Sequence, residues 1–209
     1  MFWEKKEFTY SILVPPLSKE IDKLNADEAE DFFKWYQDRI QERIDYLSCF
    51  CLDYLKLKRE KLKFEPQSLV YIWECFLKVA EIEVKLENKT TDIKDDKKKS
   101  VDMFEDYDAR QLSLQTEYIL RDIGMYLGEM FVKYHPQIYW SFYTEPKTDF
   151  FVNQPLLLGF EDKEFTPPFQ MEFEPIHMVG VQAANLFDGT QKKTDLLNLY
   201  RKWEKYIPE

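Results

Sequence analysis

The sequence predicts an α+β fold that is mostly helical, with about five helices and a small antiparallel sheet. Apolar residues recur at helical spacing in three stretches between residues 25 and 134, with charged residues between them. All five glycines lie between Gly124 and Gly189, so turns and close backbone approaches belong to the second half of the chain. Residues 138–160 have the pattern of two strands joined by a turn, which predicts the sheet.

The first 87 residues are expected to be helical after a short N-terminal strand at residues 8–14, which could join the sheet. Asn25 and Glu28 have the spacing of a capping box, so a long helix is predicted to begin there. Pro66 suits the first turn of a second helix, because a backbone N–H would be unbonded at that position anyway. Both helices carry wide apolar stripes and therefore need a partner surface.

Residues 88–108 mix charges of both signs and are predicted to form a mobile, solvated loop. Each half of the chain looks short of a complete core by itself. The expectation is therefore a single domain over residues 1–209, with the loop lying between a helical half (1–87) and a helix-plus-sheet half (109–209).

A third helix is predicted at residues 112–134, the most regular stretch of the chain. Gly124 and Gly128 are four residues apart and share one face of this helix. Each costs about 1 kcal/mol relative to alanine in a helix interior, so a close backbone approach is expected at that face.

Proline and glycine residues mark the predicted boundaries of helices and strands in the C-terminal part of the chain. A turn at 145–149 separates a strand at 138–144 from one at 150–160, which Pro155 limits to an edge or a bulge. Residues 165–173 are predicted to be a Pro-rich loop. Pro175 opens a helix that ends at Gly189, and Thr194 caps a last helix to residue 206.

The charge balance constrains the partners. Twenty-nine Lys and Arg residues oppose 39 Asp and Glu residues, which gives a net charge of −10. That charge argues against nucleic-acid binding, which depends on neutralising phosphates, and it could steer a basic protein toward the chain. Aromatic residues make up 17% of the chain and suit both a thick core and an interaction surface.

The start of the chain lacks the pattern of a secretion signal, and no run of residues approaches the length of a membrane span. The three cysteines, Cys49, Cys51 and Cys75, lie in predicted helices and are expected to be buried free thiols. A cytoplasmic protein that contacts no membrane is the resulting prediction.

The turn between the two predicted strands provides the candidate binding residues. Lys147, Asp149 and Asn153 place polar groups where a plain hairpin would need Gly or Asn, and Trp140 or Tyr143 could serve as an aromatic anchor. The alternative interpretation is a turn whose polar groups bond one another.

Catalytic chemistry has weaker support in the sequence. Asp122 and Glu129 are seven residues apart on one helix face and could act as an acid–base pair, with His177 as a neutral base. The alternative is that all three are structural. With two histidines and no clustered cysteines, no metal site of the zinc type is expected, and no glycine-rich loop indicates a nucleotide, so no cofactor is predicted. Coordination of a harder ion by carboxylates alone stays open.

Several segments together resemble a group of small, uncharacterised bacterial cytoplasmic proteins. They are residues 121–129 (RDIGMYLGE), Trp140, Pro146 with Lys147, Asn153 and residues 173–180 (FEPIHMVG), with similarity also in residues 31–44 and 68–73. Such proteins look like neighbours of bacterial toxin systems, and the role that the resemblance implies is binding, in the manner of an immunity protein.

Two functional hypotheses follow from the sequence. The first is a non-enzymatic protein-binding module whose partner is another protein, in the narrowest form a basic toxin. The second is a hydrolase or transferase with Asp122, Glu129 and His177 in a cleft between the long helix and the sheet. A homodimer through the Gly124/Gly128 face or through the aromatic surface is a further structural possibility.

Overall fold

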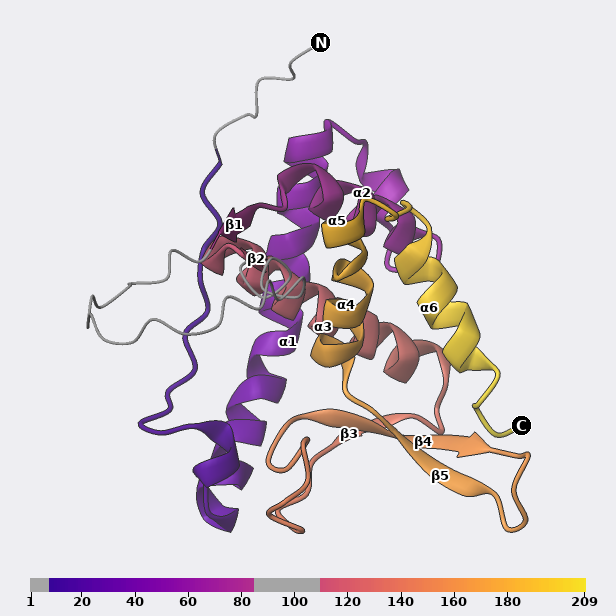
Figure 1. The fold of residues 1–209 in the computed structure, drawn as a ribbon. Coiled ribbons are helices and arrows are strands. Elements are labelled where there is room, and N and C mark those ends of the chain that lie inside the picture. The colour runs from indigo at the N-terminus through magenta and orange to yellow at the C-terminus, as the bar shows by residue number, and fades with distance from the viewer. Residues whose placement is uncertain (1–7, 85–109) are drawn as a thin grey trace, which may run out of the picture.

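The structure, a computed structural model, describes residues 8–84 and 110–209 of the chain (Figure 1). The predicted α+β class is confirmed. The described residues form five helices of nine or more residues and two small antiparallel sheets. The larger sheet lies at one end of the molecule, with the helices gathered on one side of it (Figure 1).

The long helix α1 (Ala26–Leu55) begins where the sequence predicts. The side chain of Asn25 accepts a hydrogen bond from the backbone N–H of Glu28, and the Glu28 carboxylate accepts one from the N–H of Asn25, so the capping box is complete. The helix ends at Lys56, which adopts the left-handed conformation common at helix C-termini.

Helix α2 (Ser68–Val79) follows the short 3-10 helix η2 (Arg59–Leu62), and Pro66 lies in the turn just before α2. Helix α3 (Leu114–Tyr134) is the centre of the fold and packs against α1, α2 and α4. Ser113 caps α3, since its hydroxyl accepts a hydrogen bond from the N–H of Thr116.

The expected close approach at the glycine face of α3 is confirmed. A Cβ on Gly124 would lie 2.9 Å from the backbone Cα of Ile176, and a Cβ on Gly128 would lie 2.4 Å from two ring atoms of Trp140. Because α4 and the sheet occupy this face within the chain, the face is not free to pair with a second copy. The surface needed for a homodimer through these glycines, one of the structural possibilities considered above, is thus used for packing within the chain.

The larger sheet has the strand order β3 (Tyr139–Ser141), β4 (Leu156–Asp162) and β5 (Phe169–Phe173), and both pairs are antiparallel. Trp140 pairs with Leu157, and Leu157 pairs with Phe173. The register shifts between Leu157 and Phe160. Gly159 lies in that shift with φ = 103°, where a Cβ would meet the Gln137 carbonyl oxygen at 2.1 Å, so only glycine fits.

Two expectations about strands are wrong. Residues 8–17 are extended but pair with no strand of the described chain, because Tyr10 is drawn into the helical core instead. The segment 165–173, predicted to be a loop, contains β5. The strand is only five residues long and follows two prolines, so its sequence gives little sign of a strand. The second strand of the predicted hairpin begins only at Leu156, so Pro155 lies before it.

The smaller sheet pairs β1 (Ile82–Val84) with β2 (Arg110–Leu112) and joins α2 to α3. The predicted loop at residues 88–108 lies outside the described residues. Cys51 and Cys75 are buried as expected, whereas Cys49 is exposed, and all three cysteines are free.

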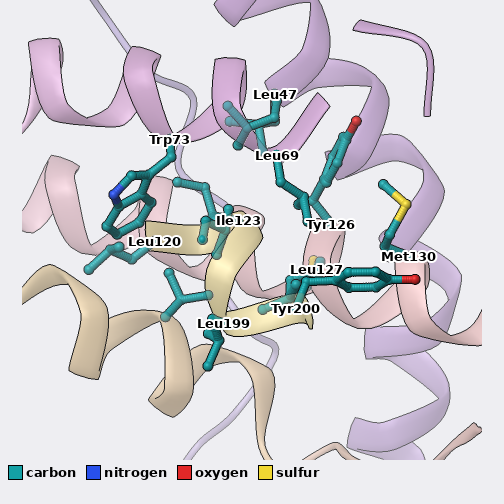
Figure 2. Packing of buried hydrophobic residues seen from close by; sticks show 14 of the residues in the cluster. Leu47, Leu69, Trp73, Leu120, Ile123, Tyr126, Leu127, Met130, Leu199 and Tyr200 are labelled. Atoms are coloured by element: carbon teal, nitrogen blue, oxygen red, sulfur yellow. The ribbon is translucent and has the colours of Figure 1, made fainter. Parts of the chain in front are cut away.

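The C-terminal region supplies α4 (Pro175–Ala183), α5 (Asn185–Asp188) and α6 (Asp195–Glu204). Gly189 ends α5 in the left-handed conformation, as the sequence predicts, but the single helix predicted from Pro175 to Gly189 is divided into α4 and α5 at Ala184. One hydrophobic cluster joins helices of both halves of the chain to the sheet. Figure 2 shows its centre, where Leu69 and Trp73 of α2 meet Ile123 of α3 and Tyr200 of α6.

Candidate functional site

The turn after β3 is tied to the start of the helical half. Asn153 is fully buried with φ = 62°, and its Nδ2 donates to the carbonyl oxygens of Ile21 (2.8 Å) and Leu24 (3.1 Å). The ammonium group of Lys147 donates to the same Leu24 carbonyl at 3.1 Å. Both side chains thereby satisfy carbonyls at the end of the short 3-10 helix η1 (Ile21–Lys23).

Tyr143 and Asp149 bond each other across this turn. The Tyr143 hydroxyl donates to the Asp149 carboxylate and contacts the Glu172 carboxylate at 3.1 Å. Asp149 also accepts from the N–H of Phe151 at 2.7 Å. These bonds hold the pKa of Asp149 below its ordinary value, with the Tyr143 hydroxyl as the largest cause.

Trp140 joins the sheet to α3. Its indole N–H donates to the Glu129 carboxylate at 3.1 Å, and its ring lies over Gly128 and makes an edge contact with Tyr36, with the ring centroids 5.5 Å apart. The five residues predicted as a contact set therefore lie in one region, and each has a polar group that bonds within the chain, although Oδ1 of Asn153 is buried without a hydrogen-bond partner among the described residues. Their role in partner binding stays a prediction.

The outer face of the sheet, which points away from the helices, is partly open to solvent, although Leu156 on the same face is fully buried. Strand alternation and register place on it Tyr139 of β3, Leu158 and Glu161 of β4, and Gln170 and Glu172 of β5. We call these five residues the outer sheet surface. Tyr139 is 54% exposed. Phe165 and Phe169, which lie at the β4–β5 turn with ring centroids 6.1 Å apart, are 58% and 62% exposed.

A buried ion pair joins the two halves of the chain. The Nε of Arg43 on α1 donates to Oδ1 of Asp122 on α3 at 2.9 Å, and the Tyr10 hydroxyl donates to the same carboxylate. The second guanidinium nitrogen of Arg43 donates to the Ser11 carbonyl oxygen at 2.8 Å. Burial raises the pKa of Asp122, whereas Arg43 and Tyr10 oppose that rise. This network holds the N-terminal segment against α1 and α3.

Beside this network lies a cavity of about 140 Å³. The N-terminal segment, α1, α3, the loop before β4 and the start of α4 form its walls, and Asp122 and Arg121 contribute to the lining. Most of the lining is apolar or aromatic, with Phe32, Trp35 and Tyr36 supplied by α1. A concave, mostly apolar site with a few polar groups is typical of small-molecule binding.

Glu174 is the buried carboxylate at the far wall of the cavity. It caps α4 and accepts hydrogen bonds from the backbone N–H of Ile176 (3.2 Å) and of His177. Burial raises the pKa of Glu174 to about 7, and the two N–H bonds oppose the rise only in part. A carboxyl group that titrates near neutral pH inside a cavity is a common property of functional sites.

The three residues of the predicted catalytic set each meet different partners. Asp122 is committed to Arg43 and Tyr10, and Glu129 bonds Trp140. The His177 ring packs against the rings of Phe150 and Phe151, at 5.5 and 5.4 Å between centroids. Of the three, Asp122 alone lines the cavity. Within the described residues, no group of three or more His, Cys, Asp or Glu side chains is placed to hold a metal ion.

The structure adds residues that the sequence did not single out, namely Tyr10, Arg43, Tyr36 and Glu174. The role of Glu174 as a helix cap could have been predicted from the sequence, because an acidic residue directly before a helix-opening proline lies at the N-cap position. The other three looked like ordinary members of amphipathic patterns, since their burial depends on contacts between distant elements.

Comparison of the chain with protein-family models, with curated proteins and with solved structures finds no match. No helix in the part of the chain that the structure describes has both the length and the apolar character to cross a membrane.

Proposed function

We propose that the protein is a non-enzymatic cytoplasmic binding protein that recognises a basic protein partner through the outer sheet surface. The observation that carries the proposal is a partly solvent-open sheet face that combines an exposed aromatic ring, Tyr139, with the carboxylates Glu161 and Glu172. Exposed aromatic side chains on a rigid sheet are suited to anchor a partner, because they bury a large area and lose few rotamers.

The charge of the same region selects a basic partner. Residues 139–173 contain six Asp or Glu residues and two Lys residues, a net charge of −4. This segment of 35 residues therefore carries two fifths of the chain's net charge of −10. One of its two lysines, Lys147, bonds the Leu24 carbonyl inside the fold. A basic protein would be steered toward this side of the molecule, and an acidic one would be repelled.

The narrow form of the proposal is neutralisation of a basic toxin. Its support is the resemblance of residues 121–129 and 173–180 to bacterial proteins that neighbour toxin systems. These segments include the α3 face and the start of α4: Trp140 over Gly128 packs the sheet on α3, and Ile176 over Gly124 packs α4 on α3. The resemblance thus concerns the scaffold, while the charge and the aromatic residues supply the argument for the partner.

The test is affinity capture from the source cell with three immobilised proteins. They are the wild type, the variant Tyr139→Ser/Glu172→Gln, which changes two residues of the outer sheet surface, and the control Leu114→Ser, which removes a 60% exposed apolar side chain at the start of α3. We expect one stoichiometric partner of basic isoelectric point on the wild type and on the control, reduced at least about tenfold on the double variant, as for hot-spot residues.

Three results would overturn the proposal. One is the absence of a stoichiometric partner. Another is a partner of acidic isoelectric point, or one that the double variant retains as well as the control does. The third is a wild-type homodimer in light scattering that the double variant dissociates, because the outer sheet surface would then pair copies of this chain.

A further inference from the structure

The cavity between the N-terminal segment, α1, α3 and α4 contains a polar pair that the proposed protein recognition does not use. The Tyr36 hydroxyl is buried, with the residue 3% exposed, and it has no hydrogen-bond partner among the residues that the structure describes. Glu174 is also 3% exposed and lines the same cavity. Buried tyrosine hydroxyls usually find a partner, so an unpartnered one beside a buried carboxylate indicates a ligand.

The walls define what such a ligand can be. Phe32 and Trp35 stack with their ring centroids 5.8 Å apart, and Tyr118 and Ile176 continue the apolar lining. Aromatic rings together with a carboxylate attract an organic cation. The volume of about 140 Å³ is close to that of an engineered protein cavity of about 150 Å³ that holds benzene.

We propose that this cavity binds a small primary amine with an apolar body about the size of one ring. The ammonium group donates to the Glu174 carboxylate and to the Tyr36 hydroxyl oxygen, and the body lies against the aromatic wall. Asp122 does not compete for the ammonium, because Arg43 and Tyr10 already occupy its carboxylate.

The charged groups around the cavity leave the Glu174 carboxylate available to a bound cation. The groups around Glu174 are Tyr36 on α1, the backbone N–H of His177 on α4, and Asp122 and Arg121 on α3, with Glu129 acting on Tyr36 from further along α3. Arg121 is exposed and lies over the Tyr118 ring, 5.1 Å from its centroid, so its charge is placed at the surface rather than in the cavity.

This arrangement gives amine binding a specific pH dependence. Burial raises the pKa of Glu174 to about 7, so its carboxyl group is mostly protonated at pH 5 and mostly ionised at pH 8. An alkylamine stays protonated over this range. Affinity for the amine should therefore increase between pH 5 and pH 8 by up to about tenfold, the loss expected when the carboxylate is neutralised, and it should not depend on pH over this range in Glu174→Gln.

The experiment is calorimetric titration of the full chain at pH 8 with benzylamine, benzyl alcohol and benzoate, which share one ring and differ in charge. We expect saturable 1:1 binding of benzylamine with Kd on the order of 1 mM, weaker binding of the alcohol, and none of benzoate. Tyr36→Phe, which removes only an unpartnered hydroxyl, should weaken benzylamine about tenfold, as should Glu174→Gln. The control Tyr71→Phe lies outside the cavity and should bind as the wild type does.

A lysine side chain of a protein could present the same ammonium group, so a blocked lysine (N-acetyl-lysine N-methylamide) forms a further arm. It should bind less tightly than benzylamine, because its peptide groups exceed the cavity. The proposal is overturned if benzylamine does not saturate, if the alcohol or benzoate binds at least as tightly, if the blocked lysine binds more tightly, or if Tyr36→Phe has no effect. The outer sheet surface takes no part in this titration, so the proposal for the protein partner stands or falls separately.

Discussion

Glu174 should make the stability of the protein depend on pH in an unusual direction. Its folded-state pKa of about 7 lies above its ordinary value of 4.5, so the folded protein holds a proton there that the unfolded chain releases. The stability from this group is complete below about pH 4.5 and is lost as the pH rises through about 7. One pKa unit corresponds to about 1.4 kcal/mol, so the loss amounts to about 3 kcal/mol.

The assay compares the wild type with Glu174→Gln by urea unfolding at 25 °C across pH 4.5–8. All other titrating groups are common to the two proteins, so the difference between their unfolding free energies isolates Glu174. We expect the wild type to lose about 3 kcal/mol relative to the variant as the pH rises over this range. A difference that stays constant within about 0.5 kcal/mol would refute the argument, because Glu174 would then titrate as an exposed carboxyl does.

Three further predictions concern the contacts that assemble the fold. Asp122→Asn leaves the buried guanidinium of Arg43 without its counter-charge and should lower the unfolding free energy by about 3 kcal/mol; a loss below 1 kcal/mol in urea unfolding would contradict this. Gly128→Ala places a Cβ 2.4 Å from the Trp140 ring and should cost about 1–2 kcal/mol even after its gain in helix propensity, with a shifted tryptophan emission; unchanged emission and stability would show that the ring does not lie there. Asn153→Ala loses two hydrogen bonds at φ = 62° and should cost about 2–3 kcal/mol, whereas Asn153→Gly should cost less because glycine tolerates that φ; equal losses would rule out the backbone contribution.

Local signals predicted the helices of this fold. The capping box at Asn25 and Glu28, Pro175 at the first turn of α4 and Gly189 after α5 each act within one helical turn, so the sequence alone locates them. The close approach at Gly128 was also predictable, because glycine is costly in a helix interior unless a neighbour needs the space. The neighbour itself, Trp140, was not.

Local sequence signals could not predict the strand pairing or the cavity. β5 is five residues long, and whether such a segment pairs depends on a partner strand rather than on its own pattern. Arg43 and Tyr36 lie about two turns apart on α1, and in the sequence both are ordinary members of an amphipathic helix. They become an ion-pair partner and a cavity wall only when α3 and the N-terminal segment pack against them.

The proposed recognition of a basic partner by the outer sheet surface is tested most directly by association kinetics. The captured partner is purified and mixed with the wild type, with Glu164→Gln/Glu172→Gln from the sheet region, and with the control Asp38→Asn/Asp53→Asn, which removes two exposed carboxylates from α1. If the sheet region steers the partner, the association rate constant falls at least about tenfold between roughly 0.05 and 0.5 M salt, and at low salt it falls more for the sheet variant than for the control. An association rate constant that is independent of salt, or that the control variant lowers as much as the sheet variant does, would contradict the proposal.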